Sequence, residues 1–148
     1  MSYVAGFIMF VVGVMVFAVI NAGFHSYGMM LLIDLPSVAG LLFINCAVIV
    51  ATGTSRLFVD AIKHVVTGRG VLKNEDKEKA TALFATLSRV TMLAALMFTV
   101  MSIMMLLVNL DDMNAIGPML MIALLSLFYG AVINIIVHLP IIYILKHR

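Results

Sequence analysis

Long apolar runs separated by short polar stretches form the main pattern of this chain. Residues 1–33 contain no Asp, Glu, Lys or Arg, and further uncharged runs cover 35–55 and 90–110. Each run is long enough for a membrane-spanning helix, which needs about 20 mostly apolar residues. The last run is longer than one span needs, so we expect its helix to tilt or to protrude. The pattern predicts four spanning helices, at about residues 3–24, 35–55, 90–110 and 116–145.

The charged residues predict how these helices are oriented. All nine Lys and Arg residues lie either between the second and third predicted helices or at the C-terminal end. The other two connections carry only acidic residues, Asp34 in one and Asp111 and Asp112 in the other. Basic connections stay on the cytoplasmic side of a membrane. Both termini and the middle connection are therefore predicted to face the cytoplasm, and the two acidic connections to face outward.

The middle connection, at about residues 56–89, is predicted to be a cytoplasmic helical hairpin. Asn74 is a suitable N-cap, and Glu75 and Asp76 follow in the first turn, where the helix dipole favours acidic side chains. We expect the third helix to begin near Glu75 and to enter the membrane unbroken, and the second to continue to about Val66. The charges fit a solvated hairpin, or a small contact surface for a cytoplasmic partner.

Composition agrees with a membrane protein. Of 148 residues, 64% are hydrophobic and 11% are charged, whereas a soluble domain is nearer half apolar and a quarter charged. The expected fold is all-α, a single four-helix transmembrane domain over residues 1–148. The first segment lacks the basic start and cleavage site of a signal peptide. Cys46 lies in an apolar run and is expected to serve packing.

Enzymatic and nucleic-acid functions have no support in the sequence. The chain carries no phosphate-binding loop, nucleophile triad or zinc-ligand spacing, so we expect no enzymatic activity, no metal site and no cofactor. The net charge of +2 gives no reason to expect nucleic-acid binding.

Ionisable groups are nearly absent from the predicted spans. Asp60 and His138 lie near the cytoplasmic helix ends, His25 lies near an outer connection, and no Asp or Glu occupies the centre of a span. Transport proteins usually place such groups at membrane depth. Either this chain moves no ions, or another chain supplies the titratable group, and composition leaves both possibilities open.

Uncharged side chains in the spans predict contacts between helices. Asn45 and Asn134 are expected to face protein, because an amide is costly to expose to lipid. The third helix has one face of methionines, which predicts a soft packing surface, and the second has a stripe of small residues suited to close helix contact. The methionines are Met97, Met101, Met104 and Met105, and the small residues are Gly40, Ala47 and Ala51.

The segment from Asn109 to Asn134 carries the most specific motif, with N-L-D-D, I-G-P, A-L-L and Y-G-A in order. It resembles the flagellar stator A-subunit family (MotA, PomA), within the MotA/TolQ/ExbB proton channel superfamily. Asp34-Leu35-Pro36-Ser37 is similar to that family's D-x-P-S before helix two. The similar positions are Asn109, Leu110, Asp111, Asp112, Ile116, Gly117, Pro118, Met119 (offset by one), Ala123, Leu124, Leu125, Tyr129, Gly130, Ala131 and Asn134.

The resemblance implies a function. It implies a multi-pass A-type subunit of the bacterial inner membrane, which forms a homopentamer in the bilayer around two copies of a single-span B-type subunit (MotB/PomB-like). The partner's Asp would carry the ion, and the ion gradient would drive rotation. Thr99 and Ser126 would face that Asp, with Tyr129 on the same ion pathway. Structural or gating positions at the outer helix ends would be Pro118 (in the first turn of helix four), Asp111, Asp112 and Pro36.

The chain also departs from that family. Leu127 stands where the family has a second threonine, and the loss of one oxygen favours H⁺ over Na⁺ as the ion. Helix three lacks the family's proline near Met92, and the cytoplasmic region is much reduced, which leaves contact with a rotor open. The reduced region also suits an envelope-energising motor subunit of the TolQ/ExbB kind. A membrane scaffold with no ion flux is the remaining alternative.

Overall fold

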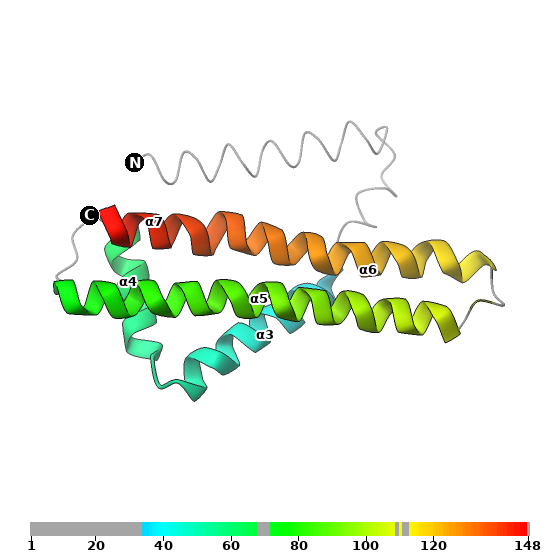
Figure 1. Cartoon of the computed structure of the whole chain (residues 1–148), viewed down its shortest axis with the longest axis horizontal. Coiled ribbons are helices and arrows are strands. Elements are labelled where there is room, and N and C mark those ends of the chain that lie inside the picture. The colour runs from blue at the N-terminus through cyan, green and yellow to red at the C-terminus, as the bar shows by residue number, and fades with distance from the viewer. Residues whose placement is uncertain (1–33, 68–71, 109, 111–112, 148) are drawn as a thin grey trace. The chain divides into compact units, whose positions relative to one another are not determined.

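The computed structural model describes residues 34–67, 72–108, 110 and 113–147 (Figure 1). Every regular element in these residues is a helix, so the all-α expectation is confirmed for them. The elements are α3 (Leu35–Ala51), α4 (Ser55–Thr67), α5 (Asn74–Val108), α6 (Met113–Ile133), a π-helical turn η1 (Asn134–His138) and α7 (Leu139–His147). The predicted first span, at about 3–24, lies outside the described residues. Residues 36–148 form one compact unit.

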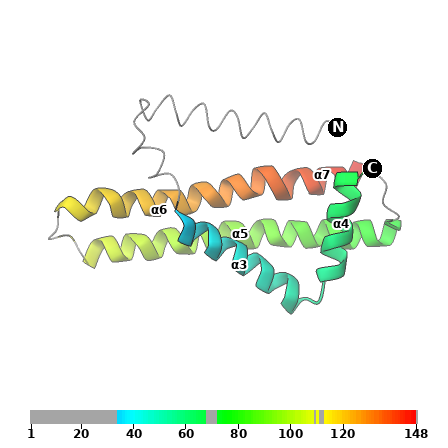
Figure 2. The same cartoon turned by 180° about the vertical axis from the view of Figure 1, so that it is seen from behind.

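Two long helical rods run side by side in opposite directions (Figure 1, Figure 2). One is α5, with 35 residues, and the other is α6 continued through η1 into α7. Both are long and apolar enough to cross a membrane, and α3 with α4 passes the same test only as a bent pair. The described residues therefore contain two candidate spans, or three if the bent pair is one.

The start of α5 follows the prediction closely. The helix begins at Asn74 and continues without a break to Val108. The Lys73 carbonyl accepts the first helical hydrogen bond, from the Lys77 N–H at 3.0 Å, so the cap position is Lys73 rather than Asn74. Glu75 and Asp76 lie in the first turn as expected. The acidic first turn thus places the helix start to within one residue.

The second predicted helix is not continuous, and this expectation was wrong. α3 ends at Ala51, and α4 leaves it with a bend of 116°. Gly53 has φ +65°, a left-handed conformation that glycine adopts without steric cost. Its N–H bonds to the Val50 carbonyl and the Thr54 N–H bonds to the Ile49 carbonyl, the two bonds of a Schellman motif. The glycine ends the helix although the apolar pattern continues past it.

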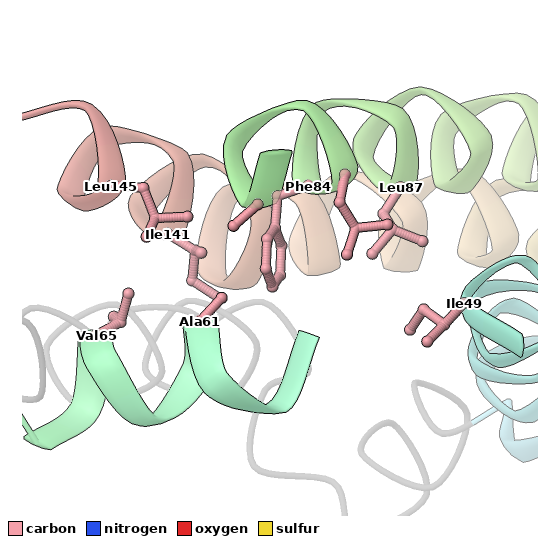
Figure 3. Close-up of a cluster of buried hydrophobic side chains, with 9 residues drawn as sticks. Ile49, Ala61, Val65, Phe84, Leu87, Ile141 and Leu145 are labelled. Carbon is pink, nitrogen blue, oxygen red and sulfur yellow. The ribbon is translucent and has the colours of Figure 1, made fainter. Parts of the chain in front are cut away.

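Two clusters of buried apolar residues hold the helices together. The large cluster joins α3, α4, α5 and α7, and Figure 3 shows Phe84 between Ala61 on one side and Leu87 on the other. It contains Ile49, Ala61, Val65, Ala80, Leu83, Phe84, Leu87, Ile141 and Leu145. The small cluster joins α3 and α5 and contains only Leu41, Ala94 and Ala95, with Tyr129 and Ile133 of α6 packed against it.

Around the small cluster, glycines let neighbouring helices pack closely, in place of large interlocking side chains. A Cβ added to Gly130 would lie 2.4 Å from the Ala95 Cβ, and one added to Gly40 would lie 2.9 Å from the Phe98 ring. Atoms that close would have to move apart. At Gly130, α6 therefore approaches the backbone of α5 closely, whereas at Gly40 it is the Phe98 ring of α5 that fills the space against α3. Small residues allow this kind of packing in membrane helix bundles.

Candidate functional site

Hydrogen bonds between helices run along the inner faces of α3, α5 and α6. The first joins Ser37 of α3 to Ser126 of α6, with 2.9 Å between the two Oγ atoms. Ser126 is fully buried, and its hydroxyl also lies 3.2 Å from the Ile122 carbonyl one turn earlier. The contact attaches α3 to α6 through side chains that are 89 positions apart in the sequence.

Thr99 forms the second contact, between α5 and α6. Its Oγ1 lies 2.9 Å from the Ala95 carbonyl of its own helix and 3.0 Å from the Ala123 carbonyl of α6, so one O–H is shared between two acceptors. The side chain is half-buried. Among the described residues, no group donates a hydrogen bond to Oγ1. A hydroxyl oxygen has two acceptor lone pairs, so this oxygen can still accept a hydrogen bond.

The third contact pairs Asn45 of α3 with Thr91 of α5. The Thr91 hydroxyl donates to Asn45 Oδ1 at 3.0 Å and to the Leu87 carbonyl at 2.8 Å. The Asn45 amide donates to the Leu41 carbonyl at 2.8 Å, and Thr91 is fully buried. The expectation that Asn45 faces protein is therefore confirmed.

The π-helical turn η1 holds a fourth polar group. Asn134 Nδ2 donates to the Ser88 carbonyl of α5 at 3.1 Å, and His138 Nδ1 lies 3.1 Å from Asn134 Oδ1. Since Oδ1 can only accept, the Nδ1–H of His138 is the donor in this hydrogen bond. Asn134 faces protein as expected, and both side chains are buried. π-Helical turns occur often at functional sites.

The turn itself was not predicted. In η1 the Leu139 N–H bonds to the Asn134 carbonyl, five residues back. Pro140 follows directly and has no N–H to give to the Ile136 carbonyl. A wider turn before a proline relieves the crowding that its ring would cause in a regular helix. A proline near the end of a long apolar run was the available signal.

The remaining predicted site residues lie apart from these contacts. Tyr129 is half-buried beside the small cluster, and its ring centroid is 5.9 Å from that of Phe128. Pro36 is exposed in the first turn of α3. Pro118 is the sixth residue of α6, so the expectation that it lies in the first turn was wrong, because the helix begins earlier, at Met113. Asp111 and Asp112 lie outside the described residues.

Among the described residues, the side chains that make these contacts carry hydroxyls, amides and the His138 imidazole, and none of them carries a carboxylate. Within the described residues, every buried side-chain nitrogen or oxygen has a hydrogen-bond partner. The same part of the chain has no group of three or more His, Cys, Asp or Glu side chains that could hold a metal ion. Thr99 and Ser126 lie on one helix pair, but no described hydrogen bond joins them.

Comparison with known proteins places this arrangement in a family. Residues 47–148, more than half of the chain, match the MotA/TolQ/ExbB proton channel family. The chain belongs to the MotA/TolQ/ExbB proton channel family. The prediction of this family is confirmed. Thr91, Thr99, Ser126 and η1 all fall within the matched part, whereas Ser37 and Asn45 on α3 precede it.

Within this family, the chain is similar to a protein of the MotA/PomA group, as the motif predicted. The chain is 29% identical over 82 residues to the chemotaxis protein PomA of Vibrio alginolyticus. The match covers 55% of this chain and 32% of PomA. The matched part thus spans about a third of the length of this relative.

Proposed function

We propose that the chain is the A-type subunit of an ion-driven rotary motor in the bacterial inner membrane. Its four spans would place both termini in the cytoplasm and the acidic connections outside. A pentamer of this chain would surround two copies of a single-span B-type subunit whose Asp carries the ion. The single observation that carries the proposal is Thr99, a half-buried hydroxyl at the α5–α6 contact of a proton channel family member.

Thr99 has the chemistry that such a carboxyl needs. A charged Asp at membrane depth costs roughly 3 kcal/mol or more unless it is neutralised or hydrated. Thr99 Oγ1 gives its proton to backbone carbonyls and keeps acceptor capacity. It can therefore accept the O–H of a protonated Asp or bind a water molecule beside the ionised form. Loading and release of the proton would change where the partner sits most favourably against the ring, and the ring would turn.

Ser126 and Tyr129 take supporting places on the same path. Ser126 is fully buried, and its hydrogen bond to Ser37 attaches α3 to α6 within one subunit. Tyr129 follows one turn later and is half-buried. We propose that Thr99 contacts the ion-carrying Asp, and that Ser126 and Tyr129 shape the path beside it.

The proposed ion is H⁺. Leu127, which is partly exposed, stands where the resemblance calls for a second threonine. A sodium ion needs several oxygen ligands, whereas a proton transfer needs one donor and one acceptor. The polar groups near Thr99 can supply one donor and one acceptor for a proton more readily than several oxygen ligands for a sodium ion.

A second candidate is a motor that energises the cell envelope, as the TolQ and ExbB side of the family name suggests. Between α3 and α5 the described chain has one helix of 13 residues, α4, and the first turns of α5. This is little surface for torque on a large rotor. Both candidates share the Asp-bearing partner, and a scaffold with no ion flux would not need one.

Proton flux in vesicles tests the proposal. The chain is co-purified with the single-span protein from the same genome and reconstituted with a pH-sensitive dye inside. Thr99→Ala should lower the flux several-fold while the complex still assembles, and Thr99→Ser should retain most of it. Thr86→Ala is the matched control, because Thr86 also donates to a carbonyl of its own helix, at 3.0 Å, but is exposed.

Each outcome separates the candidates. Normal flux in Thr99→Ala would remove Thr99 from the ion path. No flux in the unchanged complex, with the partner's Asp intact, would favour the scaffold. Flux that needs that Asp, without any effect on swimming, would favour the envelope motor.

A further inference from the structure

α4 is a short amphipathic helix that crosses the two long rods (Figure 2). Its buried face, made of Ala61, His64 and Val65, packs on α5 and α7 within and beside the large cluster (Figure 3). The 116° bend after α3 sets it across the direction of the spans rather than along it. An interfacial helix has this orientation relative to the spans, because it lies in the plane of the membrane surface.

The exposed part of α4 is sorted by chemistry. At 100° per residue, Val59 and Val66 form one edge beside the buried face, and they are 46% and 65% exposed. Arg56 and Lys63, seven residues apart, occupy the next sector and are exposed. The remaining edge carries Asp60 and Thr67, also exposed. Going round the helix, the order is therefore protein, apolar, basic, and then acidic or polar.

This order matches the layers of a bilayer surface. α4 runs past α5 toward the end of α7 (Figure 2), and around the helix its exposed edges follow in the order apolar, basic, and then acidic or polar. Interfacial helices place apolar side chains at the acyl boundary and Lys or Arg among the headgroups. Within the described residues, neither Arg56 nor Lys63 has an ion-pair partner.

We propose that α4 is a lipid-binding helix, seated on the cytoplasmic surface with its valine edge in the bilayer and Arg56 and Lys63 on anionic phospholipid headgroups. The cytoplasmic leaflet is negatively charged, and basic side chains near it are attracted. The occupant is thus a lipid rather than an acidic protein, because the basic sector adjoins exposed valines. The proposal rests on this helix and on the predicted cytoplasmic side of the connection that contains it, and it holds whether or not the chain is a motor subunit.

Depth measurements on spin-labelled chains test this placement. In a Cys46→Ser background, each of Val59→Cys, Val66→Cys, Asp60→Cys and Thr67→Cys is labelled in the full chain, reconstituted in phosphatidylcholine with phosphatidylglycerol. Labels at the two valine sites should collide mainly with oxygen, and labels at the Asp60 and Thr67 sites mainly with a water-soluble nickel chelate. Retained helix content and elution volume show that each variant is folded.

Two patterns would overturn the proposal. High nickel access at all four sites would mean that α4 stands away from the membrane. Low access to both reagents at the valine sites would mean that a protein surface covers them, either a second copy or another partner.

The anionic lipid has its own test. With the label at Val66→Cys, nickel access should fall when phosphatidylglycerol is added to phosphatidylcholine vesicles. Arg56→Gln with Lys63→Gln should abolish that change, and Asp60→Asn, on the acidic or polar edge, should leave it intact. A label that is equally lipid-embedded in both kinds of vesicle would overturn the role of the two basic side chains.

Discussion

The two ends of α5 are packed by different means. Near its start, α5 contributes Leu83, Phe84 and Leu87 to a cluster of large side chains like the core of a soluble protein. Further along, its inner face carries Thr91, Ala95 and Thr99, which meet small residues and polar groups. The apolar side chains that follow, from Met97 to Val108, are mostly exposed.

We attribute this difference in packing to different surroundings, with water around the start of α5 and lipid around its later turns. In water, burying apolar area drives folding. The part of α5 that packs near α4 would therefore need a core. In lipid, apolar surface outside costs nothing, and helices associate through close packing and hydrogen bonds. The change from one kind of packing to the other near Leu87–Thr91 leads us to expect that α5 enters the membrane there.

The largest expected loss of stability follows a substitution in the large cluster, near the start of α5. Phe84→Ala removes a fully buried ring that stacks on Phe58 with 5.3 Å between centroids. Truncating a buried Phe costs about 3–5 kcal/mol, so the free energy of unfolding in detergent should fall by that amount. The matched control is Met104→Ala on the same helix, which is exposed and should change little. Equal losses in the two variants would show that the large cluster is not a core.

An intermediate effect is expected at the closest helix approach. Gly130→Ala places a methyl group against Ala95 and should destabilise the α5–α6 contact by about 1–3 kcal/mol. Adding Ala95→Gly makes room and should restore most of the stability. Gly117→Ala is the control, since no atom lies within 4 Å of its added Cβ. If the double variant is no better than the single one, the contact is not as close as described.

The smallest effect is expected from a single polar contact. Asn45→Leu removes the Asn45–Thr91 hydrogen bond but leaves Thr91 bonded to the Leu87 carbonyl. Hydrogen bonds between membrane helices contribute about 0.5–1 kcal/mol, so the midpoint of thermal unfolding should move only slightly. A loss as large as that of Phe84→Ala would mean that hydrogen bonds, rather than packing, hold this half together.

The sequence predicted what depends on long patterns. Uncharged runs predicted helices, and the acids after Asn74 predicted the start of α5. The cost of exposing an amide to lipid predicted that Asn45 and Asn134 face protein, and the structure gives each a partner on α5. The motif around Ile116-Gly117-Pro118 predicted the family without any spatial information.

Features set by one or two residues were missed. Gly53 ends α3 inside an apolar stretch, and hydropathy does not detect a left-handed backbone. The π turn before Pro140 and the Ser37–Ser126 contact depend on helix register, which no sequence period fixes. Such details decide where polar atoms meet, so the site is less predictable than the fold.

Surface expectations had mixed outcomes. Cys46 is exposed on α3, and its expected packing role stays a prediction. Of the small stripe, Gly40 lies against Phe98 while Ala47 and Ala51 are exposed. The methionine face is exposed along α5, where lipid or another subunit can pack on it, and its role stays a prediction.

We propose that several copies of this chain form a ring around a partner that carries the Asp. Native mass spectrometry of the complex extracted from its own membrane measures this directly. We expect a pentamer of this chain with two copies of a single-span protein that carries an Asp in its membrane segment. A monomer, or a ring in which no such partner is found, would contradict it.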